Sequence, residues 1–304
     1  MPIDLLKLAP RVAVCDGGWS TQLQALGLPA DVPAEVANVT HTYLVEKLAR
    51  DYLAAGAQVI TTNTFACNPY LFALRGAKHD PRDVARAGVE SLRKTIGSMV
   101  PLVGVIGPSG KIMAIQEVPE SELATEYQAS ARVLSEAGVD AIVLETFSEL
   151  SELLLAVGAV KSVANLPVIA CLSFDSGPQR SRTRMGVTAE DAAKALDASD
   201  ADIIGSNCGG GAATALAALV ALRSGTSKPI WIKPSAGIPD LDQGRAVYPQ
   251  STDEFGAAIP PLLEGGASYI GGCCGVGPEH IRRVAHLVES HRRHRRAVVA
   301  EQRS

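Results

Sequence analysis

Short runs of consecutive apolar residues alternate along this chain with longer stretches in which apolar residues recur at helical spacing. Unbroken apolar runs are typical of strands buried on both faces of a parallel sheet. The predicted strands are residues 12–15, 58–61, 102–106, 141–144, 168–173, 202–205, 229–232 and 268–271. The predicted helices are residues 42–54, 82–97, 121–137, 150–163, 189–196, 212–222, 252–263 and 278–290.

Several of these helices carry boundary signals. Thr188 precedes one helix as a candidate N-cap, and Pro278 opens another with an acidic residue directly behind it. Glycines stand just after three helical stretches, where the chain often needs a left-handed residue: Gly56, Gly138 and Gly266. These signals support the predicted alternation of strands and helices.

Eight strands alternating with eight helices predict an α/β protein with a single (β/α)8 TIM barrel. The competing open sheet requires a glycine-rich dinucleotide turn after its first strand, whereas this chain has Asp16-Gly17-Gly18-Trp19-Ser20. We find no linker-like segment, so we expect residues 1–304 to form one domain. The run from about residue 291 is rich in arginine and predicts a basic helical tail with a solvated end.

Composition narrows the class of partner. The 304 residues are 47% hydrophobic and 20% charged, as expected for a globular protein with a large core. A formal net charge of −4 gives no electrostatic reason to expect nucleic acid or an anionic membrane as a partner. No apolar run is long enough to span a bilayer. We therefore expect a cytoplasmic protein that acts on small molecules.

Three of the six cysteines stand where metal ligands are expected. Cys208 follows the sixth predicted strand, and Cys273 and Cys274 follow the eighth. The carboxyl ends of barrel strands meet at one face, so these sulfurs are expected to converge there. Thiolates are preferred zinc ligands, and three protein ligands with an open fourth position are typical of a catalytic site. The sequence therefore predicts a three-cysteine Zn²⁺ site whose fourth position is left for a substrate.

The residues at the strand ends resemble one known family. The segments are Asp16-Gly17-Gly18, Thr62-Asn63-Thr64-Phe65, Glu145-Thr146-Phe147, Gly205-Ser206-Asn207-Cys208, Gly271-Gly272-Cys273-Cys274-Gly275 and Pro278-Glu279-His280-Ile281. Together these segments resemble the zinc-dependent homocysteine S-methyltransferases, and they occur in the same order over nearly the whole chain.

The resemblance implies transfer of a methyl group to the thiol of homocysteine, which gives methionine. It also implies the (β/α)8 fold and zinc held by the three cysteines. Acidic residues at the matching motifs serve the substrate ammonium in the family, and that role is carried over to Asp16 and Glu145. Backbone N–H groups of Gly17 and Gly18 are candidates for the substrate carboxylate. Thr62 is a further substrate-binding candidate, and Asn207 is expected to orient the metal ligands.

The sequence leaves the methyl donor and some alternatives open. The resemblance allows S-methylmethionine, S-adenosylmethionine, betaine or a methylated corrinoid as donor, and a corrinoid would come on a separate protein. The acceptor could also be another small thiol or a selenol. The competing hypotheses are a zinc or thiol-binding barrel without catalysis, and a metal-free lyase or aldolase barrel that uses Lys233 for a Schiff base.

Overall fold

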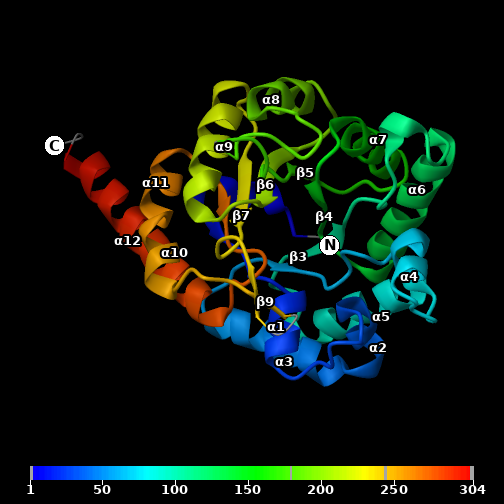
Figure 1. Ribbon diagram of the computed structural model, residues 1–304. Helices are drawn as coiled ribbons and strands as arrows, with labels where there is room; N and C mark the ends of the chain where they lie inside the picture. The colour runs from blue at the N-terminus through cyan, green and yellow to red at the C-terminus, as the bar shows by residue number, and fades with distance from the viewer. Residues whose placement is uncertain (1–2, 179, 243–244, 302–304) are drawn as a thin grey trace.

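The computed structural model describes residues 3–178, 180–242 and 245–301 and contains an eight-stranded parallel sheet surrounded by helices (Figure 1). The strands lie in the order β1, β10, β7, β6, β5, β4, β3, β2. The sheet closes into a barrel through a parallel bridge between Cys15 and Val59. The strands are β1 (Ala13–Val14), β2 (Ile60–Thr61), β3 (Leu102–Ile106), β4 (Ala141–Phe147), β5 (Val168–Leu172), β6 (Ile203–Cys208), β7 (Ile230–Pro234) and β10 (Tyr269–Ile270).

The eight strands and the (β/α)8 architecture predicted from the sequence are confirmed, and each predicted helix has a counterpart. One prediction needs correction: the expected helix over 252–263 is two helices, because Pro260 and Pro261 lack the N–H groups that continuation requires. The main helices are α3 (Thr42–Ala54), α5 (Pro81–Ile96), α6 (Glu120–Ala137), α7 (Leu150–Lys161), α8 (Ala189–Asp197), α9 (Ala212–Ser224), α10 (Thr252–Ala257), α11 (Ile259–Glu264) and α12 (Pro278–Glu301).

The boundary signals act as predicted. The Thr188 hydroxyl accepts a hydrogen bond from the Asp191 N–H at 3.1 Å, and Pro278 is the first residue of α12. The three glycines after helices have φ angles of 103°, 100° and 89° for Gly56, Gly138 and Gly266. Each is in the left-handed region, which glycine adopts without the steric penalty that a Cβ brings.

Alternate residues of the strands fill the barrel interior. This inner cluster includes Cys15, Val143, Cys171 and Trp231, all fully or almost fully buried. A 3-10 helix, η1 (Leu5–Arg11), belongs to the same cluster, and the Tyr269 hydroxyl donates to its Leu5 carbonyl at 2.6 Å. The N-terminal segment therefore packs into the barrel core, and Cys15 and Cys171 are packing residues as expected.

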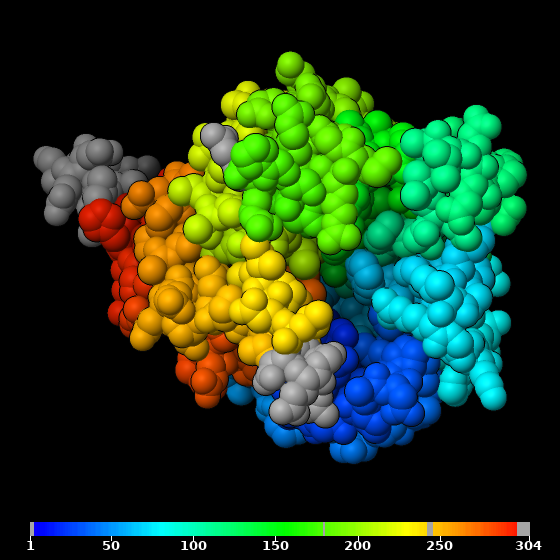
Figure 2. Space-filling model, viewed as in Figure 1, coloured from blue at the N-terminus to red at the C-terminus, as the bar shows by residue number. Residues whose placement is uncertain are grey.

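Short elements that the sequence did not predict surround the opposite end of the barrel, where the strands end. Figure 2 shows a hollow on this face, bordered by the blue, cyan and yellow parts of the chain. These elements are α1 (Ser20–Ala25), η2 (Ala34–Val36), α2 (Ala37–Thr40), α4 (Pro69–Leu74), η3 (Met113–Ile115) and an antiparallel hairpin of β8 (Asp240–Asp242) and β9 (Arg245–Val247).

The basic segment from residue 291 continues α12, which extends beyond the barrel in Figure 1. Within the described part of the chain, no helix combines the length and apolarity needed to cross a membrane.

Candidate metal centre

The three cysteines lie at neighbouring strand ends. Cys208 is the last residue of β6, and Cys273 and Cys274 follow β10, with β7 between these two strands in the sheet. Backbone hydrogen bonds hold the ends together: the Cys273 N–H donates to Pro234 O at 2.8 Å, and Ser235 N–H donates to Cys208 O at 3.2 Å. The parallel pairing therefore brings together residues that are 65 or more positions apart in the sequence.

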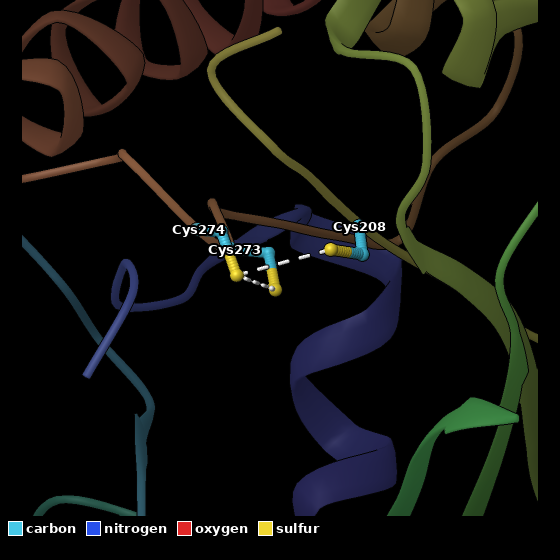
Figure 3. Close-up of side chains that lie close together, drawn as sticks. All are labelled: Cys208, Cys273 and Cys274. Carbon is cyan, nitrogen blue, oxygen red and sulfur yellow. Dashed lines mark hydrogen bonds between the residues drawn. The ribbon is translucent and has the colours of Figure 1, made fainter. Parts of the chain in front are cut away.

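The three Sγ atoms all lie within 4.8 Å of one another, and Figure 3 shows them pointing toward a common region. The distance to Cys274 Sγ is 3.9 Å from both Cys208 Sγ and Cys273 Sγ. Tetrahedral zinc with Zn–S bonds of about 2.3 Å would require sulfurs about 3.8 Å apart. The arrangement fits one thiolate-bound metal ion.

The cluster already favours a thiolate. Cys208 and Cys273 donate their S–H groups to Cys274 Sγ. Hydrogen bonds from these two thiols, and a third from the Tyr248 hydroxyl, lower the pKa of Cys274 to about 3. They do so because hydrogen bonds stabilise the thiolate form of the sulfur. The three side chains are half-buried and line a cavity, so a ligand can reach them.

Two residues with strained backbones support the cluster. Cys208 has a φ of 60° and Thr146, at the end of β4, has a φ of 66°. Residues other than glycine rarely adopt a positive φ. Such a strained backbone persists where surrounding contacts fix its conformation. Asn207 supplies these contacts: its Oδ1 accepts from Thr146 N at 2.7 Å, and its Nδ2 donates to Thr146 Oγ1 at 2.7 Å. The same Nδ2 lies 3.8 Å from Cys273 Sγ, so Asn207 connects β4 to the cluster.

A cavity of about 280 Å³ opens beside the cysteines, and Glu145 lines it. Glu145 lies two residues beyond the inward-facing Val143, so the alternation of the strand directs it to the interior. No described residue donates a hydrogen bond to its carboxylate. Burial, reinforced by the nearby Cys273, raises its pKa to about 8. The cavity therefore contains an acidic group that a cationic ligand can pair with.

Asp16 has a different environment from Glu145. It is fully buried, and its Oδ1 accepts from Lys233 Nζ at 2.6 Å. Its Oδ2 accepts from Thr61 N at 2.7 Å, from Thr61 Oγ1 at 2.8 Å and from Trp19 Nε1 at 3.2 Å. Both oxygens thus have partners within the protein, and Asp16 is absent from the cavity wall. The geometry favours Glu145 over Asp16 for contact with a ligand.

Lys233 lines the cavity and is 3% exposed. Burial lowers the pKa of Lys233, but the Asp16 and Glu145 carboxylates together raise it by more, so the net shift of the pKa is upward. A Schiff-base lysine must lose its proton to act as a nucleophile. Lys233 is held protonated, which argues against the aldolase-type hypothesis.

Gly17 and Gly18 pass close to the segment after β10. A Cβ at Gly18 would lie 2.5 Å from Cys273 O, and one at Gly17 would lie 2.2 Å from Val276 O. The Gly18 N–H donates to Val276 O at 2.9 Å, so it is already used within the protein. No acceptor in the described chain takes the Gly17 N–H.

Thr62 is 1% exposed and also lines the cavity. Its hydroxyl accepts from Val105 N–H at 2.9 Å and lies 2.6 Å from Thr64 Oγ1. All the predicted site residues thus lie at the same end of the barrel, but Thr62, like Asp16, is engaged with protein partners.

One ion pair at this cavity was not predictable from the sequence. Arg75 Nη1 donates to Glu35 Oε2 at 3.1 Å, and both residues line the cavity. Glu35 is almost fully buried and also accepts from Ala66 N–H at 3.1 Å. Neither residue follows a predicted strand, so strand-end position could not identify them.

Comparisons with known proteins identify the family of this chain. A sequence model of the family described as homocysteine S-methyltransferase matches residues 13–288. The chain is 31% identical over 318 residues to a methionine synthase of Mycobacterium tuberculosis, an alignment that covers 98% of this chain and 26% of that protein. It is 27% identical to homocysteine S-methyltransferase 1 of Zea mays over 325 residues, which cover 96% of this chain and 98% of the maize protein.

Among solved structures, the metallated form of the homocysteine methyltransferase MmuM from Escherichia coli superposes with a TM-score of 0.75 at 22% identity, covering 91% of this chain and 96% of MmuM. A methyltransferase from Methanosarcina mazei gives a TM-score of 0.60 at 17% identity, over 94% and 97% of the two chains. These structures share the fold. The chain spans about a quarter of the mycobacterial methionine synthase but nearly all of the maize protein. The match of the family model over most of its length shows that this chain belongs to the homocysteine S-methyltransferase family.

Proposed function

We propose that this protein is an enzyme that moves a methyl group to the thiol of homocysteine and releases methionine. Family membership supports the reaction. The observation that carries the proposal is the convergence of three cysteine sulfurs within 4.8 Å beside a cavity of about 280 Å³. A cavity of that size accommodates an amino acid, and the cluster lies on its wall.

We infer that Cys208, Cys273 and Cys274 hold zinc. Three thiolates with a vacant fourth position suit zinc, and the E. coli relative is described in a metallated form. A bound zinc ion would lower the pKa of a coordinating substrate thiol, which is then available as a thiolate at neutral pH. Asn207 restricts the positions of Thr146 and of the Cys273 sulfur, so it acts as a positioning residue.

The amino-acid part of homocysteine is bound by residues of the same cavity. Glu145 pairs with the substrate ammonium, since it is the cavity carboxylate without a protein donor. Asp16 keeps Lys233 charged and orients the segment that leads to Gly17. The Gly17 N–H is available to the substrate carboxylate, while the Gly18 N–H and the Thr62 hydroxyl maintain the cavity wall.

The partners proposed here are homocysteine and a methyl donor, which could be a small molecule or a methylated corrinoid on a separate protein. A cytoplasmic location stays a prediction from the sequence.

The test is methionine formation by purified, zinc-loaded protein with homocysteine and a panel of donors, including S-methylmethionine, S-adenosylmethionine, betaine and methylcobalamin. X-ray absorption at the zinc edge provides a second measurement. We expect one additional sulfur neighbour when homocysteine binds. An unchanged set of neighbours together with no methionine from any donor would reject the proposal in favour of a zinc-binding barrel without catalysis.

A further inference from the structure

A second cavity, of about 400 Å³, lies at the end of the barrel opposite to the cysteines. Val12 and Ala13 at the start of β1 line it, together with Gln58 just before β2. These residues lie at the beginning of their strands, whereas the cysteines lie at or beyond the strand ends. The proposed methyl transfer gives this cavity no role.

Four arginines make the cavity strongly basic. Among the described residues that line it, the charged side chains are Glu289, Arg11, Arg292, Arg295 and Arg296. His291 also lines the cavity, but burial and the neighbouring Arg295 lower the pKa of its imidazole, which is therefore neutral near pH 7. The wall thus carries an excess of three positive charges, in a chain whose formal net charge is −4.

Two separate elements bring these guanidinium groups together. Arg292, Arg295 and Arg296 are three and four residues apart on α12, so they lie on one face of the helix. Arg292 Nε donates to Arg11 O at 2.7 Å, and this contact joins residues 281 positions apart in the sequence. Arg11 is the last residue of η1 and lines the same cavity with its exposed side chain. The docking of α12 on η1 therefore assembles the cationic wall.

Three of the four guanidinium groups are available to a ligand. Arg11, Arg295 and Arg296 are exposed, and no described group accepts a hydrogen bond from their side chains. The single carboxylate of the wall is already paired, because Glu289 Oε1 accepts from Arg293 Nε at 3.1 Å and Oε2 lies 3.6 Å from Arg292 Nη1. Guanidinium groups bind phosphate oxygens with directional, charge-assisted hydrogen bonds. An anion in this cavity would meet several unpaired cations at once.

Most of the remaining wall is apolar. Leu8 and Pro10 of η1 line the cavity beside Val12 and Ala13. An apolar wall next to cationic groups suits a ligand that carries an anionic group on an apolar or aromatic body. The volume is within the range of small-molecule sites, which is about 300 to 1,000 Å³. Nucleic acids and membranes instead present extended anionic surfaces, which a concave site of this size does not match.

We propose that this cavity binds a small organic phosphate, such as a nucleotide. Arg11, Arg295 and Arg296 hold its phosphate groups, and the apolar residues of η1 contact its organic part. The site is separate from the metal centre, so this inference does not depend on the proposed function.

The experiment measures binding to the full-length, zinc-loaded protein by isothermal titration calorimetry. The three probes are ATP, adenosine, which lacks the phosphates, and tripolyphosphate, which lacks the organic part. Each is tested with the wild type, Arg11→Gln, Arg295→Gln and Arg296→Gln. Arg282→Gln is the matched control, because Arg282 is exposed on the same helix, carries the same charge and does not line the cavity.

ATP should bind with a stoichiometry of about one per chain and weaken as salt is added, since salt screens exposed charges. Adenosine should give no measurable binding, and tripolyphosphate should bind more weakly than ATP. Each of the three cavity variants should raise the Kd for ATP roughly tenfold, as expected for the loss of one charge-assisted contact. Arg282→Gln should leave this Kd within about twofold of the wild type.

Equal weakening by Arg282→Gln would show that ATP responds to the net charge of the protein, and this would overturn the proposal. Tripolyphosphate that binds as tightly as ATP would reject an organic ligand. A protein that ignores ATP but binds single-stranded RNA, or vesicles of phosphatidylcholine and phosphatidylserine, would show a surface contact in place of a small-molecule site. Absence of binding to every probe would also reject the site, whatever the methyl-transfer assay gives.

Discussion

At the scale of single residues, the sulfur of Cys208 is supplied by a different strand from the other two. Replacement with serine in Cys208→Ser leaves two thiolates and a hydroxyl, which is a poor zinc ligand. We expect bound zinc to fall from about one ion per chain to well below half, measured by mass spectrometry after dialysis. Cys67→Ala is the control, since Cys67 is buried outside the cluster, and it should retain the metal. Full zinc content in Cys208→Ser would contradict the ligand assignment.

Glu145 is expected to affect both the free energy of unfolding and the binding of homocysteine. Its folded pKa of about 8 lies above the unfolded value of 4.5, so the folded state holds a proton that the unfolded state loses between these pH values. The free energy of unfolding should therefore fall as pH rises from about 5 to 8, with each pKa unit equivalent to about 1.4 kcal/mol at most. Glu145→Gln removes this dependence.

Substrate-free Glu145→Gln should consequently be more stable than the wild type at pH 8 and similar to it at pH 4.5, as thermal denaturation would measure. The same variant should bind homocysteine at least tenfold more weakly by calorimetry, since the ammonium loses its charged partner. Gain of stability with loss of affinity is typical of a functional residue. A variant less stable than the wild type at pH 8 would show that Glu145 has a structural partner instead.

The roles of individual residues were predictable where their position at the end of a strand was enough to place them in the site. Cys208 ends a strand, and Cys273 and Cys274 follow one, so the topology alone brings them to one end of the barrel. The difference between Asp16 and Glu145 was not predictable, because it depends on Lys233 of β7 reaching past β10 to contact Asp16 at 2.6 Å. That contact depends on the direction of the two side chains near the ends of β1 and β7.

At the scale of elements, the turn after β1 packs directly against the segment after β10. In Gly18→Ala, the new methyl group would meet Cys273 O at 2.5 Å, so one of the two segments must move. We expect weaker zinc binding and a lower melting temperature. Gly158→Ala is the matched control: Gly158 lies on an exposed face of α7 with no atom within 4 Å of the added methyl. Gly158→Ala should raise the free energy of unfolding by up to about 1 kcal/mol, because alanine has a higher helix propensity than glycine. Unchanged zinc affinity in Gly18→Ala would refute this coupling.

The long elements were predictable because their signals are local. Apolar runs and helical periodicity identified β3 to β7 and the outer helices, and an N-cap at Thr188 fixed one boundary. The shorter elements α1, α4 and the β8–β9 hairpin contain six residues or fewer each and have little periodicity. Their conformations depend on packing against the barrel, so tertiary contacts rather than local sequence determine them.

At the scale of the whole molecule, α12 joins the two ends of the chain. Arg292 Nε donates to Arg11 O at 2.7 Å, and Arg292 Nη2 donates to Val12 O at 2.6 Å and to Gln58 Oε1 at 3.0 Å. Val12 has a φ of 54°, which a β-branched residue adopts only under constraint. The predicted basic tail is therefore partly structural, and the expectation of a fully solvated helix end is wrong at Arg292.

Arg292→Ala should lower the free energy of unfolding by about 2 kcal/mol, because it removes several charge-assisted hydrogen bonds. Arg293→Ala should lower it by about 0.5 kcal/mol or less, since its side chain is 77% exposed and its partner among the described side chains is Glu289. Urea denaturation of the two variants measures the difference. Equal effects would indicate that α12 does not stabilise the N-terminal segment.

The expectation of one domain over 1–304 stays a prediction.

The strands differ in length around the barrel, and this has a consequence for its dynamics. β3 to β7 have five to seven residues, whereas β1, β2 and β10 have two each. Amide protons in the short-strand sector should exchange with deuterium sooner than those of β4 and β5, because fewer ladder bonds must open together. Cys208 ends a long strand and Cys273 follows a short one. A zinc ion bound to both would therefore link the slowly exchanging strands to the rapidly exchanging ones. Loading the metal should then slow exchange mainly in residues 268–276.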